Sequence, residues 1–207
     1  MKEIYFAENW IVHETEKFIT DEECDELIEF AKPLLSESLI KGGEKNVKRQ
    51  SQTAWLTYKD SPIVRDIQYK ICEKLLVPLN ILENLQIIKY EPGGHYITHY
   101  DFYTSNNEQV RHGGGQRMFT NLINLNDDFE GGETEFPQMG KVCVPKKGKM
   151  ITWRNALTTS LFLPQTEHSG NPVKSGTKWA AVQWVRQFPF ERNDKSYWER
   201  VQDMKLS

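Results

Sequence analysis

The spacing of apolar residues changes near residue 85, and the two parts of the chain predict different structures. Before this point, apolar side chains recur every three or four residues, which is the period of an amphipathic helix. One such stripe consists of Ile63, Ile67, Ile71 and Leu75. Thr20 and Glu23 have the spacing of a capping box, and Ser61 followed by Pro62 is a second helix start. We therefore expect two helices, beginning near residues 21 and 62.

After residue 85, short runs of branched and aromatic residues are separated by Gly, Pro and Asn, a pattern typical of strands joined by turns. The expected strands cover residues 85–90, 119–125, 142–145, 150–153 and 179–185. Many short strands without intervening helices favour a barrel made of two sheets. The expected fold class is α+β, mainly β, with a double-stranded β-helix (jelly-roll) core and flanking N-terminal helices.

A length of 207 residues fits one domain with a sizeable core. We expect residues 1–84 to form a helical and supporting-strand region that packs on the core as part of the same domain. Residues 85–190 should form the jelly-roll core, and residues 191–207 a C-terminal tail.

The composition narrows the classes of partner. Hydrophobic residues make up 38% of the chain, charged residues 27%, and the formal net charge is −3. Without a basic excess, we expect neither nucleic acid nor membrane as a partner. The first residues contain no apolar run of signal-peptide length, so the expectation is a soluble, cytoplasmic protein. The sequence does not set an oligomeric state.

Three residues form a candidate metal site. His99 and Asp101 are two apart, so on a strand their side chains would share one face, and His168 would come from another strand. Two imidazoles and one carboxylate can hold Fe(II) and leave positions open for chemistry. His95 is excluded, because four residues along a strand span about 13 Å. The same three residues could also hold zinc, or be ordinary surface and core side chains.

Several segments resemble, in order and spacing, the catalytic domain of the prolyl 4-hydroxylases, which are Fe(II)- and 2-oxoglutarate-dependent dioxygenases. The resemblance rests on residues 90–101, 131–137, 144–148 and 168–179, and it covers roughly residues 15–187. Arg49 and Ser51 match an arginine-serine segment that precedes the catalytic strands in that family.

The resemblance implies that His99, Asp101 and His168 are the iron ligands. It also implies that Lys178 binds the distal carboxylate of 2-oxoglutarate, which makes Lys178 the fourth candidate catalytic residue. Such a role fits the physical chemistry, because a carboxylate deep inside a barrel needs a cation and hydrogen bonds.

Further positions surround the co-substrate in the family. Tyr90 and Thr120 match residues that lend hydroxyl groups to 2-oxoglutarate, and Trp184 matches an aromatic wall beside it. Tyr96 matches a residue that faces the peptide substrate. Tyr90, Thr120 and Trp184 could instead be ordinary strand core.

The implied activity is that of a procollagen-proline 4-dioxygenase-like enzyme. It would use Fe(II), O2 and 2-oxoglutarate to hydroxylate proline in a peptide or protein, and it would release succinate and CO2. Ascorbate is an expected additional cofactor, and a proline-containing segment in the polyproline II conformation is the expected substrate. Two alternatives stay open: a 2-oxoglutarate dioxygenase that acts on another residue or a small molecule, and a metal-binding protein that is not an oxygenase.

Overall fold

The computed structural model describes residues 11–37, 49–103, 114–158 and 160–189. The expected C-terminal tail, residues 191–207, lies outside the described residues. The division into residues 1–84 and 85–190 stays a prediction.

Both helices begin where the sequence predicts. Helix α1 (Asp21–Ala31) carries the capping box: the backbone N–H of Glu23 donates to the Thr20 hydroxyl, and the Glu23 carboxylate accepts from the Thr20 N–H. Helix α2 (Pro62–Leu75) starts with proline at its first position. The capping interactions satisfy backbone donors that have no partner within a helix.

Antiparallel sheets form the rest of the fold. Within the described residues, seven strands make the major sheet in the order β1 (Val12–Thr15), β10 (Met150–Arg154), β6 (Arg117–Asn124), β13 (Lys178–Arg186), β4 (Leu85–Tyr90), β3 (Gln52–Leu56) and β2 (Ser36–Glu37). The minor sheet has the order β5 (Tyr96–His99), β11 (His168–Gly170), β8 (Thr134–Phe136) and β9 (Lys141–Cys143). Strands β12 (Val173–Ser175) and β7 (Glu130–Gly131) pair separately. Short 3-10 turns occupy Lys32–Leu34, Leu79–Ile81, Pro137–Met139 and Pro164–Thr166.

Strands β4, β10 and β13 of the major sheet are buried on both faces. In β4, Leu85 and Ile87 belong to the apolar cluster shared with the helices, whereas Ile88 and Tyr90 belong to a second cluster inside the barrel. Successive side chains of a strand point to opposite faces, so one strand serves both layers. Burial on both faces explains why apolar residues follow one another in such strands, as Ile87 and Ile88 do in β4.

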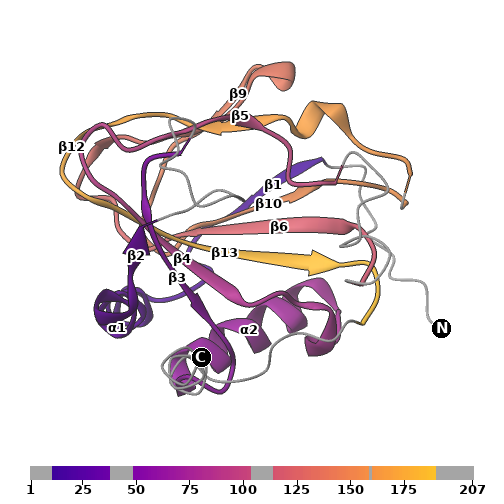
Figure 1. Cartoon of the computed structure of the whole chain (residues 1–207), viewed down its shortest axis with the longest axis horizontal. Coiled ribbons are helices and arrows are strands. Elements are labelled where there is room, and N and C mark those ends of the chain that lie inside the picture. The colour runs from indigo at the N-terminus through magenta and orange to yellow at the C-terminus, as the bar shows by residue number, and fades with distance from the viewer. Residues whose placement is uncertain (1–10, 38–48, 104–113, 159, 190–207) are drawn as a thin grey trace, which may run out of the picture.

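Figure 1 shows this layering: α1 and α2 lie along one side of the major sheet, and β5, β9 and β12 lie on the other side. The α+β, mainly β architecture with a jelly-roll core is therefore confirmed. The strand expected at residues 85–90 has the predicted ends, and the other four differ by at most two residues at either end. Among the described residues, no helix has the length and apolar character needed to span a bilayer.

Glu14, on the edge strand β1, forms ion pairs with two lysines. The Glu14 carboxylate lies 2.7 Å from Lys141 Nζ and 2.9 Å from the buried Lys149 Nζ. Burial alone would raise the pKa of Glu14, but the hydrogen bonds and charges of the two lysines outweigh it and lower the pKa from 4.5 to about 2. Glu14 therefore stabilises the fold in its ionised form.

We expect Glu14→Gln to lower the free energy of unfolding by about 2–3 kcal/mol near neutral pH, because it leaves the Lys149 ammonium buried without a counter-charge. Since the folded pKa is lowered, this contribution is full above pH 4.5 and disappears as the pH falls to about 2. Urea unfolding as a function of pH measures the difference. Glu16→Gln is the matched control, because the Glu16–Lys146 pair is exposed and should contribute less than about 1 kcal/mol. Equal losses for the two variants would contradict the prediction.

Candidate active site

His99 and His168 face each other across two neighbouring strands. They are directly paired in the register of β5 and β11, and their ring centroids are 4.2 Å apart. Each ring is fixed through Nδ1, which lies 2.9 Å from the carbonyl oxygen of Ile97 in His99 and 2.8 Å from that of Thr166 in His168. A carbonyl oxygen only accepts, so Nδ1 carries a hydrogen in both rings, and in the neutral form of each ring Nε2 keeps a lone pair for a ligand.

Asp101 completes the cluster, but it does not lie on the expected strand. Strand β5 ends at His99, and Asp101 follows in a bend. Tyr100, which regular alternation would turn away, also lines the cavity. The bend nevertheless brings the carboxylate between the imidazoles, with Oδ1 3.7 Å from His99 Nε2 and Oδ2 3.7 Å from His168 Nε2.

The three side chains suit a divalent transition metal. Their candidate ligand atoms all lie within 4.8 Å of one another. Burial and the neighbouring His168 lower the pKa of His99 to about 4, although Asp101 opposes this, so the His99 imidazole is neutral at physiological pH. Neutral imidazole and ionised carboxylate are the forms that bind such ions. His95 is not part of the cluster and has its own contact, 2.9 Å from Nδ1 to the carbonyl oxygen of Gly93.

Lys178 is a buried cation at the start of β13. Its side chain is 3% exposed and donates a 2.6 Å hydrogen bond to the carbonyl oxygen of Gly132. Burial lowers its pKa from 10.5 to about 8, with a partial opposing effect from Glu133. Lys149, which is buried as well, has the Glu14 carboxylate as its partner. Among the described residues, Lys178 has no carboxylate within 4 Å, and it lines the cavity, so it can receive an anion from outside.

Gly132 explains how the Lys178 side chain fits. The residue has φ +66°, and an added Cβ would lie 3.0 Å from Lys178 Cδ and 3.0 Å from the Phe129 ring. Glycine is therefore required both by the backbone conformation and by the close approach of the lysine.

One cavity of about 230 Å³ connects these groups. Its lining contains every residue that the sequence assigns to the site, namely Tyr90, Tyr96, His99, Asp101, Thr120, His168, Lys178 and Trp184. The alternation within β13 places Lys178 and Trp184, six residues apart, on the same inner face. Lys178 Nζ also lies 5.6 Å from the centre of the Tyr90 ring. The structure thus brings these residues together, while their individual roles stay predictions.

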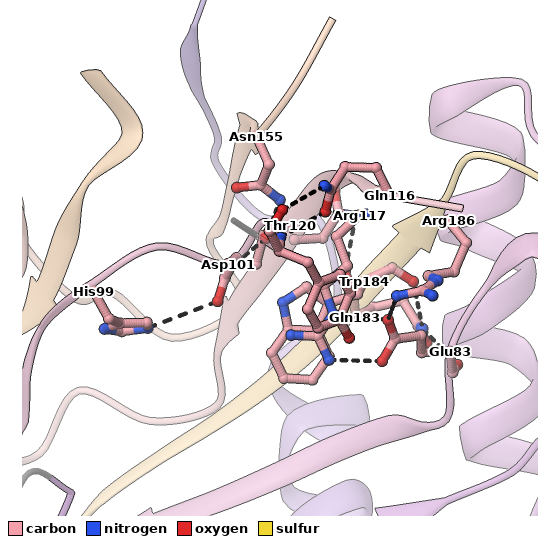
Figure 2. A network of polar contacts seen from close by, with 12 residues as sticks. Glu83, His99, Asp101, Gln116, Arg117, Thr120, Asn155, Gln183, Trp184 and Arg186 are labelled. Atoms are coloured by element: carbon pink, nitrogen blue, oxygen red, sulfur yellow. Dashed lines mark hydrogen bonds and ion pairs between the residues drawn. The ribbon is translucent and has the colours of Figure 1, made fainter. Parts of the chain in front are cut away.

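Thr120 makes a contact that the sequence did not predict. Its hydroxyl donates to Asp101 Oδ2 at 2.7 Å and accepts from Asn155 Nδ2 at 2.8 Å. Figure 2 shows the row formed by Asn155, Thr120, Asp101 and His99. A hydroxyl has only one hydrogen, and in this structure the Thr120 hydroxyl donates that hydrogen to Asp101. Donation from Thr120 to 2-oxoglutarate stays a prediction.

Trp184 belongs to a wall of stacked groups on another side of the cavity. The Arg117 guanidinium lies 3.9 Å from the centre of the Trp184 ring, and Trp55 stacks on the same ring at 5.8 Å. Glu83 accepts two hydrogen bonds of 2.7 Å from Arg117, and Figure 2 shows this pair beside Arg186. A guanidinium bound in this way is held rigidly at the cavity surface.

Tyr96 and Arg49 form the part of the lining next to His99. The Tyr96 ring stacks on the His99 ring with centroids 3.7 Å apart, and the Arg49 guanidinium lies 5.1 Å from the Tyr96 ring centre. Arg49 Nε donates to the Ser51 hydroxyl at 3.0 Å, so the predicted arginine-serine segment lies at the cavity. The sequence did not assign roles to Arg117, Thr134 or Asn155, although Arg117 and Thr134 line the cavity and Asn155 contacts Thr120.

The site geometry agrees with comparisons to known proteins. The profile of the 2OG-Fe(II) oxygenase superfamily matches residues 85–186. The putative prolyl 4-hydroxylase of Acanthamoeba polyphaga mimivirus is 35% identical over 177 residues, which cover 83% of this chain and 72% of the viral protein. The chain belongs to the prolyl 4-hydroxylase family.

Two further members of this family extend the comparison. Prolyl 4-hydroxylase subunit alpha-1 of Gallus gallus is 32% identical over 176 residues, but these cover 82% of this chain and only 34% of that subunit. The viral collagen prolyl hydroxylase of Paramecium Bursaria Chlorella virus-1, solved as a 2OG complex, has a TM-score of 0.71 and 31% identity over 86% of this chain and 97% of its own. The cofactor of this prolyl 4-hydroxylase family member is Fe(II), and 2-oxoglutarate and O2 are the co-substrates.

Proposed function

We propose that this chain is a peptidyl-proline 4-hydroxylase that converts proline in a peptide or protein to 4-hydroxyproline, with 2-oxoglutarate oxidised to succinate and CO2. The observation that carries the oxygenase part is that one cavity holds both the His99, Asp101 and His168 cluster and a buried lysine, Lys178. Among the described residues, no carboxylate lies within 4 Å of this lysine. A hydrolytic zinc site would have no use for that lysine. The choice of proline rests on the named relatives.

We assign the metal to His99 Nε2, His168 Nε2 and the Asp101 carboxylate. Bound Fe(II) supplies O2 activation, in which two electrons come from 2-oxoglutarate and two from the C–H bond that is hydroxylated. The Ile97 and Thr166 carbonyls keep both imidazoles in the ligating tautomer. The protein therefore fixes three ligands on one side and leaves the cavity side for the two substrates.

Lys178 binds the distal carboxylate of 2-oxoglutarate in this proposal. Its ammonium replaces the water that a buried carboxylate loses, and the Gly132 carbonyl keeps it aimed into the cavity. Tyr90 and Trp184 exclude water around the co-substrate, since both rings are at least nine-tenths buried. Tyr96, which stacks on His99, faces the peptide in this proposal.

The test is Fe(II)-dependent turnover of 2-oxoglutarate with a panel of peptides. Collagen-like repeats, polyproline and single-proline peptides are compared with matched peptides in which alanine replaces proline. We expect succinate to form in step with one oxygen atom added to proline, identified as 4-hydroxyproline by amino-acid chromatography. Succinate formation with a modified residue other than proline would support a different dioxygenase. No succinate with any peptide would refute the proposal.

A further inference from the structure

Behind Asp101 lies a buried pair of side chains, Asn155 and Thr120, whose hydrogen bonds to each other and to Asp101 the catalytic assignment does not use. Asn155 follows β10 and is completely buried, as is Thr120 on β6. The register of β10 and β6 places Trp153 opposite Thr120, and Asn155, two residues further on, reaches the same hydroxyl. Figure 2 shows Asn155 on the far side of Thr120 from Asp101.

The direction of these hydrogen bonds follows from what each group can do. An ionised carboxylate only accepts, so the single Thr120 hydrogen points to Asp101 Oδ2. The Thr120 oxygen then needs a donor, and the Asn155 amide supplies one from Nδ2. Asn155 therefore holds the Thr120 hydroxyl in the rotamer that donates to Asp101.

The backbone of Asn155 is itself fixed. Its N–H donates to the Met118 carbonyl at 2.8 Å, and its carbonyl accepts from the Leu163 N–H at 3.0 Å. Asp101 lies in a bend beyond the end of β5, where no strand pairing sets the direction of its side chain. The carboxylate consequently takes its hydrogen bond from the Thr120 hydroxyl, which Asn155 in turn holds in place.

We propose that Asn155 is a positioning residue for the metal site: through Thr120 it holds the Asp101 carboxylate in its ligating orientation. The inference rests on the proposed assignment of Asp101 as a metal ligand. Outer hydrogen bonds of this kind typically change metal affinity by about 10- to 100-fold. Because Asn155 does not line the cavity and its amide bonds to Thr120, its effect should pass through Thr120.

The test measures Mn(II) binding to ligand-free protein, from the electron paramagnetic resonance signal of the free ion. We expect Asn155→Leu and Thr120→Val each to weaken binding about tenfold. Thr120→Ser keeps the hydroxyl and should retain the parent affinity. In the double variant Asn155→Leu/Thr120→Val, the loss should equal that of Thr120→Val alone, since the two groups act in series.

Asn124→Leu is the matched control. Asn124 is also buried and also bonds through Nδ2 alone, to the Lys149 carbonyl at 3.4 Å, but it does not contact Asp101. We expect Asn124→Leu to change thermal stability without changing Mn(II) affinity.

Parent-like Mn(II) affinity in Asn155→Leu, or additive losses in the double variant, would overturn the inference. If the parent itself does not bind Mn(II), the proposed metal site fails, and the inference fails with it. If Asn155→Leu does not fold, the comparison of Thr120→Ser with Thr120→Val decides, and equal affinities there also overturn the inference.

Discussion

Lys178→Met is expected to abolish 2-oxoglutarate binding and, at the same time, to raise the melting temperature of the ligand-free protein. Methionine fills a similar volume but offers no charge, so the distal carboxylate would be buried without a counter-ion. In the ligand-free protein, the shift of the Lys178 pKa from 10.5 to about 8 corresponds to a cost of about 3 kcal/mol below pH 8. The substitution removes this cost but also loses the hydrogen bond from Lys178 to the Gly132 carbonyl. The net gain in stability should raise the melting temperature by about 3–6 °C.

Isothermal titration calorimetry with 2-oxoglutarate and Mn(II) measures the first effect, and thermal unfolding without ligand measures the second. Lys149→Met is the control, because this buried lysine is paired with Glu14 and lies outside the cavity lining. It should lower stability and leave 2-oxoglutarate affinity unchanged. A Lys178→Met protein that still binds 2-oxoglutarate with parent affinity would contradict the assignment.

The same lysine predicts a pH dependence. Burial lowers the Lys178 pKa to about 8 in the ligand-free site, so above pH 8 the lysine must take up a proton when the carboxylate binds. We expect 2-oxoglutarate affinity to fall about tenfold between pH 8.5 and 9.5 and to be independent of this group below pH 7. Proton uptake, measured by titrating in buffers of different ionisation enthalpy, should rise over the same range. An affinity that stays constant up to pH 9.5 would show that Lys178 does not bind the co-substrate.

His168→Ala is expected to remove metal binding and all turnover. His168 supplies one of the three candidate ligands, and the remaining His99 and Asp101 cannot enclose an ion on one face. We expect metal affinity to fall more than about 100-fold, beyond the range typical of outer-shell changes. Mn(II) binding provides the measurement, together with Fe(II)-dependent succinate formation.

His95→Ala is the matched control for that variant. His95 is four residues before His99 on the same segment, but its ring contacts the Gly93 carbonyl rather than the cluster. Its metal affinity should equal that of the parent. Similar losses in the two variants would show that the histidines act on folding rather than on the metal.

Local patterns predicted much of the fold. The capping box of Thr20 and Glu23 and the proline at the start of α2 set the helix starts, because their interactions depend only on nearby residues. The strand at residues 85–90 was predicted to its ends, since Asn84 precedes it and Pro92 and Gly93 follow it closely. The sequence also identified the candidate ligands, although the strand geometry considered for His99 and Asp101 applies only to His99, because β5 ends there.

The sequence assigned no role to Arg117 or Asn155, because the positions of their side chains depend on contacts between strands that are distant in sequence. Between Val185 and Arg186 the pairing of β13 with β6 shifts by one residue, so Arg117 does not follow the alternation that holds from Phe119 onward. Such an irregularity reverses which face a side chain occupies, and no local pattern reveals it. The contact of Asn155 with Thr120 likewise requires the register of β10 against β6.

Because the central strands of the major sheet are buried on both faces, the fold cannot be shortened freely. In β4, Ile87 packs toward the helices and contributes to the core that stabilises the fold. The next residue, Ile88, packs toward the cavity where the proposed chemistry takes place. The catalytic segment that the superfamily profile matches, residues 85–186, contains neither α1 nor α2. Expressed alone, it would present a continuous apolar sheet face to water. We therefore expect the smallest fragment that folds on its own to include α1 and α2, although both helices precede all the proposed metal ligands in the sequence.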